Sequence, residues 1–268
     1  MLELIQITND PAFALRCDAL AGMRLFVDLE RLGKAERQAG RDTFISAHSI
    51  DDVSRVKQVL RRSQLMVRVN PLHEGTRDEV EAVLARGADM LMLPMFNRPG
   101  ELREFVSIVA GRALIVPLLE TGAALACLDD WIATPGLAEV YVGLNDLHLS
   151  LGLPFMFEPL ALGLVDRVAV AARRQGLRFG FGGIARMDEG LLPGRDVLAE
   201  HLRLGSHSVI LSRTFHRSDH GDAFEAEVAS LRQAEQELAA RSPAQMDTDA
   251  RRIARTIEQI AAGMGGGR

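Results

Sequence analysis

Short, nearly continuous apolar runs recur along this chain, and each is followed by a stretch with apolar residues spaced three and four positions apart. The first pattern is typical of strands buried on both faces, and the second of amphipathic helices. The eight apolar runs occupy residues 2–8, 24–30, 64–70, 89–96, 113–120, 139–146, 178–184 and 208–215. Eight strand–helix units of this kind predict an α/β fold, a closed (β/α)₈ TIM barrel, rather than an open doubly wound sheet.

The pattern also marks where some helices begin and where the barrel ends. Ser49 followed by Asp52 has the form of a capping box, and Pro99 stands where a helix can start. The strand pattern stops after residue 218, which predicts a barrel domain at 1–218 and an extension of two additional C-terminal helices at 219–268. Their apolar stripes must be covered by the barrel or by another subunit. We expect them to stabilise a homo-oligomer, with packing inside the chain as the alternative.

Composition narrows the possible partners. The net charge is −5, basic residues are scattered, and one Trp and one Tyr offer little for base stacking, so no nucleic-acid partner is expected. Cys17 and Cys127 match no metal or redox spacing. The N-terminus lacks a signal-peptide pattern, and no apolar stretch approaches the roughly 20 residues that cross a bilayer. These features predict a cytoplasmic protein with no membrane partner.

Polar residues stand at the ends of several predicted strands, where an active site of a (β/α)₈ barrel lies. Strand 2 ends with Asp28 and Glu30, strand 3 carries Arg68 and Asn70, strand 5 ends at Glu120, and strand 6 ends with Asn145 and Asp146. If the last carboxylates of strands 5 and 6 both point into the barrel mouth, one cation can bridge them, because neighbouring strands lie about 4.8 Å apart. Carboxylate ligands suit Mg²⁺ or Mn²⁺. Alternatively, Glu120 caps the next helix and Asp146 shapes a turn.

These strand ends lie in sequence blocks that resemble the HpcH/HpaI aldolase and citrate lyase β family, metal-dependent barrels of the phosphoenolpyruvate/pyruvate superfamily. The blocks are VDLE, VRVNP, MLPMF, LLETGAA, VGLNDLHLSLG and GFGGIAR, between about residues 5 and 215. The resemblance implies that Glu120 and Asp146 hold the divalent metal. It also implies that Arg68 stabilises the enolate oxygen of a pyruvate-like 2-oxo acid, and that the backbone around Asn145 and Asp146 seats its carboxylate. The alternative for Arg68, which is compatible with this role, is an arginine buried in the barrel and neutralised by Asp28 or Glu30. Asn70, on the same predicted face as Arg68, is a candidate substrate contact.

The chain departs from the family where protons are transferred. Pyruvate aldolases carry Asp-x-Glu-His after strand 2, whereas this chain has Asp28-Leu29-Glu30-Arg31, so the family's general-base His is missing. His48 and His148 are candidate replacements, because histidine is the side chain best suited to proton transfer near neutral pH. A metal-bound water or Glu30 is the alternative. The acidic strand-2 block is closer to the citrate lyase branch.

The GFGGIAR block formally satisfies the G-x-G-x-x-A dinucleotide pattern at residues 180–185, but it begins inside a strand rather than at a strand-to-helix turn. It therefore does not predict NAD binding. Loops after strands 7 and 8 of such barrels often hold phosphate, so Gly183 and Arg186 are predicted to contact substrate, with Arg213 nearby. The alternative is close strand packing by glycine, with the arginines at the surface.

The leading hypothesis is a carbon–carbon lyase, an aldolase of the metal-dependent class II type, that acts through the enolate of a 2-oxo acid. The first alternative is a lyase acting on a CoA thioester, as in citrate lyase or malyl-CoA lyase. The second is a metal-binding barrel without catalytic activity, because a fold does not by itself specify a function.

Overall fold

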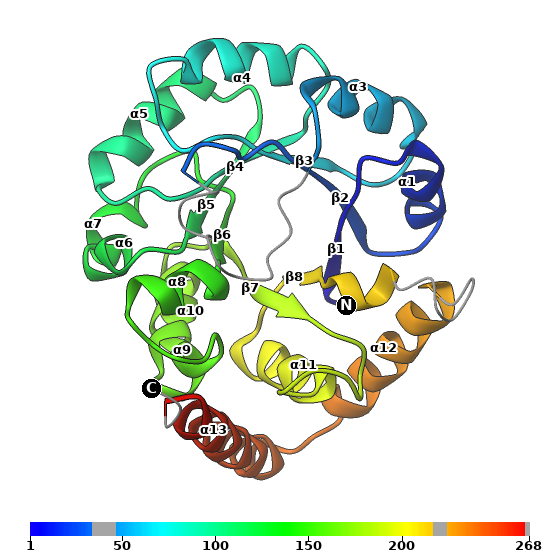
Figure 1. Cartoon of the computed structure of the whole chain (residues 1–268), viewed down its shortest axis with the longest axis vertical. Helices are drawn as coiled ribbons and strands as arrows, with labels where there is room; N and C mark the ends of the chain where they lie inside the picture. Colours follow the sequence, from blue (N-terminus) through cyan, green and yellow to red (C-terminus); the bar gives the residue numbers. More distant parts are fainter. Residues whose placement is uncertain (34–46, 217–223, 266–268) are drawn as a thin grey trace. The chain divides into compact units, whose positions relative to one another are not determined.

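The computed structural model describes residues 1–33, 47–216 and 224–265, and its strands form a closed barrel in the order β1 to β8 (Figure 1). Neighbouring strands pair in parallel, as in β2 with β3, β4 with β5 and β7 with β8. The predicted (β/α)₈ barrel is therefore confirmed. The strands are β1 Glu3–Ile7, β2 Met23–Asp28, β3 Leu65–Arg68, β4 Met90–Leu93, β5 Leu114–Leu119, β6 Glu139–Val142, β7 Arg178–Ile184 and β8 Ser208–Leu211.

Helices follow the strands along the chain. Both predicted helix starts are confirmed: the Ser49 amide donates to Asp52 Oδ2 at 2.7 Å before α3, and α5 begins at Pro99. The helices are α1 Pro11–Asp18, α3 Ile50–Val59, α4 Thr76–Leu84, α5 Pro99–Val109, α6 Gly122–Ala126, α7 Leu128–Trp131, α8 Leu144–Ser150, α9 Glu158–Ala161, α10 Leu164–Arg174, α11 Gly194–Leu204, the 3₁₀ turn η1 Arg213–His216, α12 Phe224–Ala239 and α13 Pro243–Gly265.

Several strands end earlier than the apolar pattern predicts. β3 stops at Arg68 and β6 at Val142, so Asn70 and Asp146 lie beyond the strands to which they were assigned. Alternation of side chains holds only inside a strand. The predicted faces of the residues after these ends therefore do not follow from parity.

Contacts divide the described chain into two compact units, and neither coincides with the predicted domains. The first unit is Ile5–Val140, and the second joins Met1–Leu4 to Tyr141–Arg268. The predicted boundary at residue 218 lies outside the described residues. In the first unit β2 is buried at every position, and Arg24 on β2 contacts Glu139 at the start of β6, with 2.8 Å between Nη2 and Oε2. This ion pair is fully enclosed, with side-chain exposures of 1% and 0%.

In the second unit, Tyr141 on β6 satisfies an irregular stretch of β7. Pairing of β7 with β8 shifts register between Gly180 and Gly183. The buried Tyr141 hydroxyl accepts from the Ile210 amide at 2.8 Å and donates to Gly182 O at 2.7 Å. It thereby replaces ladder hydrogen bonds that the shift removes, since buried backbone groups need a partner.

The C-terminal helices belong to this second unit. Helix α12 packs against α11, and α13 packs against α9 and α11. Their apolar stripe is covered within the chain: the buried members are Phe224, Val228, Leu231, Leu238, Ile253 and Ile257, while Ile260 is partly buried. Packing inside the chain, the alternative expectation, therefore accounts for the stripe, and the stripe no longer supports an oligomer. The homo-oligomer itself stays a prediction.

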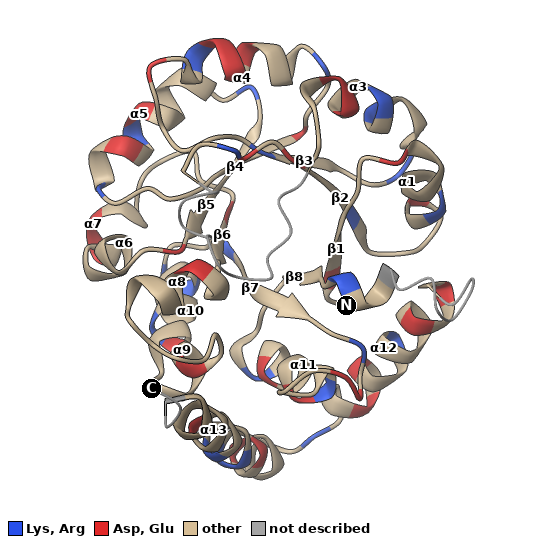
Figure 2. Ribbon diagram, viewed as in Figure 1, with Lys and Arg blue, Asp and Glu red and all other residues tan. Residues whose placement is uncertain are grey.

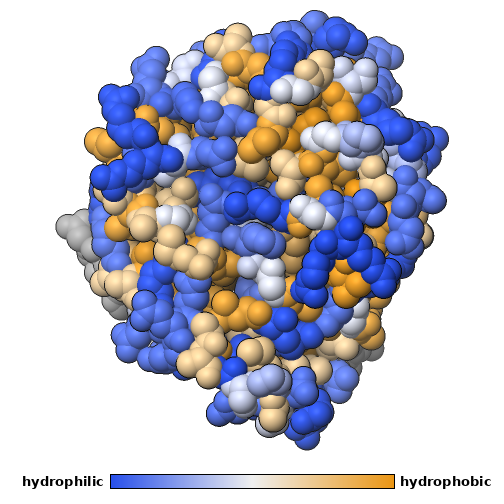
Figure 3. Space-filling view, turned by 180° about the vertical axis from the view of Figure 1, so that it is seen from behind, coloured by the Kyte–Doolittle hydropathy of each residue, from blue (hydrophilic) through white to orange (hydrophobic). Residues whose placement is uncertain are grey.

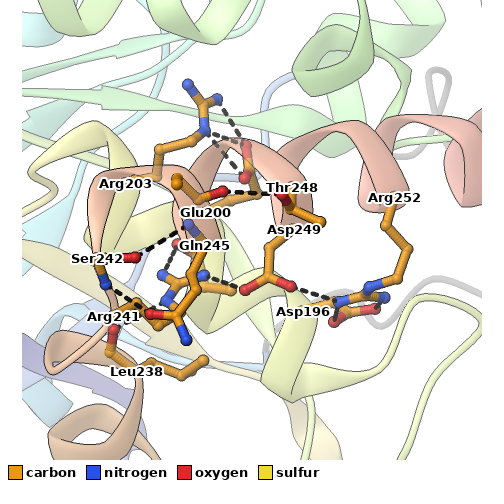
Figure 4. Close-up of polar contacts among 12 residues, drawn as sticks. Asp196, Glu200, Arg203, Leu238, Arg241, Ser242, Gln245, Thr248, Asp249 and Arg252 are labelled. Atoms are coloured by element: carbon orange, nitrogen blue, oxygen red, sulfur yellow. Dashed lines mark hydrogen bonds and ion pairs between the residues drawn. The ribbon is translucent and has the colours of Figure 1, made fainter.

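Charged residues reinforce this packing where α11, α12 and α13 meet (Figure 4). Arg241 donates to Ala199 O on α11 at 3.0 Å and to Asp249 on α13 at 2.8 Å. Arg252 on α13 makes two hydrogen bonds to Asp196 on α11, at 2.6 and 2.8 Å. These contacts fix the turn between α12 and α13 on α11.

The surface bears mixed charge. Figure 2 shows basic and acidic residues interspersed along α4, α5, α11 and α13, in keeping with the scattered charges of the sequence. On the face seen in Figure 3, hydrophobic and hydrophilic residues alternate in small groups. Among the described helices, none combines the length and apolar character required to span a membrane.

Candidate active site

Arg68, the last residue of β3, is the centre of a buried charge cluster in the first unit. Parallel pairing places it directly opposite Asp28, the last residue of β2. Arg68 Nε and Nη2 donate to the two carboxylate oxygens of Asp28 at 2.9 and 2.8 Å, and Nη1 lies 3.3 Å from Glu30 Oε2. The guanidinium carbon also lies 5.8 Å from the centre of the Phe26 ring. These contacts fix the orientation of the guanidinium plane, because a bidentate pair allows little rotation.

Three carboxylates, those of Asp28, Glu30 and Glu120, act on the single guanidinium of Arg68. Burial alone would lower the pKa of Arg68, but the charge and hydrogen bonds of Asp28, with the charges of Glu30 and Glu120, raise it above its usual value. The three carboxylates are 4%, 1% and 2% exposed. One guanidinium thus faces three buried carboxylates, and buried charge is costly unless it is paired. The cluster is therefore suited to bind a further cation.

Glu120, directly after β5, is held by the loop after β4. Its Oε1 accepts from the Met95 amide at 3.0 Å. Met95 has φ of 53°, a left-handed conformation uncommon for a residue other than glycine, and such strain is concentrated at functional sites. Thr121, not Glu120, caps α6, since its side chain accepts from the Ala124 amide. The alternative in which Glu120 caps the next helix is therefore wrong.

Asn145 and Asp146 lie in the second unit, in the first turn of α8. Gly143 is the N-cap and the helix begins at Leu144, so Asp146 occupies the third helical position. The alternative in which Asp146 merely shapes a turn is therefore wrong, although a carboxylate in the first helical turn also favours the helix dipole. Asn145 and Asp146 are both partly exposed.

Two histidines were predicted as the base, and the structure holds their rings in opposite tautomers. His48 Nδ1 accepts from the Asp28 amide at 3.1 Å, so the neutral ring carries its hydrogen on Nε2. His148 Nδ1 lies 3.1 Å from Leu144 O, an atom that can only accept, so its hydrogen is on Nδ1 and Nε2 keeps the basic lone pair. His148 is therefore better arranged to accept a proton than His48.

The Asn70 amide is bound at both ends by the protein. Its Oδ1 accepts from the amides of Arg31 and Leu32 at 2.8 and 3.0 Å, and its Nδ2 donates to Glu79 Oε1 at 2.8 Å. Both ends of the amide are thus occupied by the protein. The structure therefore gives Asn70 an internal connection beyond the end of β3, and the predicted substrate contact at Asn70 stays a prediction.

The GFGGIAR block is explained in part by packing. A Cβ on Gly180 would lie 2.3 Å from Ser208 Oγ, and one on Gly182, with φ of 55°, would lie 2.9 Å from Leu144 Cδ1. These two glycines are required by close approach, as the packing alternative proposed. A Cβ on Gly183 would meet only Ile210 O at 3.7 Å, so packing does not require that glycine.

Arg186 and Arg213 have different surroundings. Arg186 is buried, and its guanidinium lies 3.8 Å from Glu189 and 3.8 Å from Glu227 on α12, whereas Arg213 is exposed. Two nearby carboxylates weaken the attraction of Arg186 for an anion. The substrate contacts predicted for Gly183 and Arg186 stay predictions.

Sequence reasoning missed three residues of the first unit's cluster. Met95 holds Glu120 through its backbone, which no side-chain pattern signals. Glu79 and His73 hold Asn70, with His73 Nε2 3.2 Å from Glu79 Oε2 and Nδ1 accepting from the Gly75 amide at 3.0 Å. Both ring nitrogens of His73 are therefore occupied, and it is not a further candidate base. From the sequence alone, Glu79, one helical turn into α4, is indistinguishable from an ordinary solvent-exposed helix residue.

In the part of the chain that the structure describes, no group of three or more His, Cys, Asp or Glu side chains is arranged to hold a metal ion. The predicted pair, Glu120 and Asp146, would need water or substrate oxygens for the remaining positions, as is usual for Mg²⁺. The carboxylate oxygens that each residue offers are of the kind that suits such a cation.

A closed barrel with an arginine and carboxylates at its strand ends defines the class: a (β/α)₈ barrel with an enzyme-like site. The model of the HpcH/HpaI aldolase/citrate lyase family matches residues 25–181, more than half of the chain. The chain belongs to this family, and the resemblance drawn from the sequence is confirmed. Aldolases and citrate lyases are lyases, so the chain is a member of a lyase family.

Solved structures agree on the fold. An HpcH/HpaI aldolase from Desulfitobacterium hafniense matches with a TM-score of 0.60 and 17% identity, covering 90% of this chain and 94% of that one. An HpcH/HpaI aldolase/citrate lyase family protein from Burkholderia cenocepacia gives 0.64 and 17%, covering 89% and 95%. The citrate lyase beta subunit from M. tuberculosis, in complex with oxaloacetate and magnesium, gives 0.62 and 16%, covering 88% and 97%.

A shorter match links the chain to pyruvate kinase of Methylorubrum extorquens. The two are 32% identical over 108 residues, which are 40% of this chain and 21% of that enzyme. The chain thus spans about a fifth of the length of the curated relative that it matches. This match shows a shared segment only.

Proposed function

We propose that the protein is a metal-dependent carbon–carbon lyase of the aldolase type that acts through the enolate of a pyruvate-like 2-oxo acid. The observation that carries this proposal is the fixed guanidinium of Arg68, held by Asp28 at the end of β2 and close to the buried carboxylates of Glu30 and Glu120. A cation-binding cluster beside an immobilised arginine suits the stabilisation of an enolate.

Arg68 would bind the substrate through those guanidinium N–H groups that do not donate to Asp28. Two of its five N–H groups donate to Asp28, one from Nε and one from Nη2. Each terminal nitrogen therefore retains hydrogen that can meet the oxygens of a 2-oxo acid. Because the guanidinium is already oriented, little reorganisation is needed when negative charge develops on the substrate oxygen.

The divalent metal, Mg²⁺ or Mn²⁺, would be held by Glu120 and Asp146. The strands that precede them, β5 and β6, are neighbours in the barrel order, and Glu120 is buried directly after β5, where its Oε1 accepts from the Met95 amide. When bound, such an ion polarises the substrate carbonyl and stabilises the enolate. The citrate lyase beta subunit of M. tuberculosis was solved with magnesium and oxaloacetate, which supports this assignment.

A proton acceptor is still required, because Arg31 stands where the family's base would be. His148 is our first assignment for this role, since its Nε2 carries the lone pair, and Glu30 is the second. His48 instead suits donation from Nε2–H. In this proposal the backbone at Asn145 and Asp146 seats the substrate carboxylate.

The test is a retro-aldol assay on a panel of 4-hydroxy-2-oxo acids, in which the release of pyruvate is measured. It is run with Mn²⁺, with Mg²⁺ and with a chelator. We expect turnover that depends on the metal. Adding malyl-CoA and citramalyl-CoA to the panel distinguishes the thioester alternative. A protein that binds Mn²⁺ but turns over none of these compounds would contradict the proposal and favour the non-catalytic barrel.

A further inference from the structure

The end of β2 is tied to α4 through one side-chain amide. Asn70 Oδ1 accepts from the Arg31 and Leu32 amides, the two residues after Glu30. On the other side, Glu79 Oε1 accepts from Asn70 Nδ2 at 2.8 Å and from the Asn70 amide at 3.1 Å. Glu79 therefore determines which end of the Asn70 amide faces the β2 end, because a carboxylate accepts only from the NH₂ side.

The backbone around Glu30 is held on both sides by this arrangement. Before Glu30, the Leu29 amide donates to Arg68 O at 2.9 Å, and the Glu30 amide donates to Asp28 Oδ1 at 3.2 Å. After Glu30, Asn70 holds the next two amides. The Glu30 carboxylate lies 3.3 Å from Arg68 Nη1, so the held backbone on both sides of Glu30 fixes where this carboxylate meets Arg68.

The same connection reaches His48. Arg31, whose amide is bound by Asn70, donates from Nη2 to His48 O at 2.8 Å. His48 in turn accepts the Asp28 amide on Nδ1. The contacts therefore run from Glu79 through Asn70 and Arg31 to His48 and return to Asp28, one of the residues that hold Arg68.

We propose that Glu79 and Asn70 are positioning residues: they hold the end of β2 so that Glu30 faces Arg68, and they touch neither substrate nor metal. The proposal rests on the proposed lyase function for its catalytic consequence, but the connection itself is testable without activity. It also gives a reason for an asparagine two residues after the strand-3 arginine.

The test swaps the amide of Asn70 and the carboxylate of Glu79, first at residue 70 alone and then at both positions. In Asn70→Asp, the new carboxylate faces Glu79, so we expect faster amide exchange at Arg31 and Leu32 and a turnover number lower by about tenfold, the equivalent of about 1.4 kcal/mol. KM should change less than kcat. In Asn70→Asp with Glu79→Gln, the new amide donates to the new carboxylate, and its oxygen still accepts from the residue-70 amide and His73. Exchange and turnover should then return close to the original values.

The measurements are hydrogen–deuterium exchange on peptides spanning residues 27–33 and steady-state kinetics with Mn²⁺, well below the melting temperature. The control is the same exchange in the exposed pair on α12, Gln233→Glu with Glu237→Gln, whose side chains lie 3.1 Å apart. It should leave both readouts unchanged.

Three outcomes would overturn the proposal: unchanged exchange in Asn70→Asp, faster exchange with unchanged kcat, or no recovery in the double variant. A wild-type protein without lyase activity would overturn the proposed function instead. The exchange data would then still decide whether Glu79 and Asn70 hold the end of β2.

Discussion

Replacing Arg24 by methionine should destabilise the protein strongly, because it leaves a buried carboxylate without its partner. Arg24 and Glu139 are 1% and 0% exposed and 2.8 Å apart. Removing one partner of such a pair costs about 3–5 kcal/mol, whereas replacing both by apolar residues is often neutral. At roughly 2–4 °C per kcal/mol for a chain of this size, Arg24→Met should lower the Tm by about 6–20 °C. Arg24→Met with Glu139→Met should recover most of that loss.

The assay is thermal and urea unfolding followed by circular dichroism at neutral pH. Lys57→Met provides the matched control, since the Lys57–Asp89 pair is about one-third exposed and such pairs are worth about 0–1 kcal/mol. Arg24 lies four residues before Asp28 on β2, about 13 Å along the strand, so turnover per folded molecule should be unaffected. If the double variant is no more stable than Arg24→Met, unpaired charge is not the cause and the reasoning is refuted.

Three further changes test the site and its support. Arg68→Lys keeps the charge but loses the bidentate grip of Asp28, so kcat should fall by about 10²-fold or more, beyond the loss in Tm; normal turnover would rule out its role. Glu120→Gln should abolish the rise in Tm that Mn²⁺ produces, and an unchanged rise would remove Glu120 from the metal site. Burial would raise the pKa of Asp18, but hydrogen bonds from the Ser63, Arg61 and Arg62 amides lower it overall. Its stabilisation is therefore present above the unfolded pKa of about 3.9 and is lost as pH falls through the lower folded pKa. Asp18→Asn should be less stable at pH 7, with a difference that narrows at acid pH in urea titrations; a constant difference would contradict this.

The charge cluster around Arg68 shows how far strand-end reasoning reaches. Asp28, Glu30, Arg68 and Glu120 were all predicted from their places at strand ends, and three of these four are in contact or ion-pair distance. The reasoning succeeded because the polar residues inside or directly after a buried strand are too costly to bury without a partner. It does not extend to Asn70, where the chain has already left the strand and side-chain alternation no longer applies.

The sequence by itself determined the eight strands, the start of α3 and α5 and the family, because burial on both faces of a parallel sheet requires continuous apolar runs and helix starts depend on adjacent residues. Tertiary structure decided the partners. The register of β2 on β3 selects Asp28 for Arg68, the Thr121 cap leaves Glu120 uncommitted to α6, and the acceptor or donor beside each ring sets the tautomers of His48 and His148. The two contacts of Asp28, with Arg68 and with His48, join groups 40 and 20 residues apart in the chain. The Thr121 cap and the His148 contact are local, but they form only once α6 and α8 have folded.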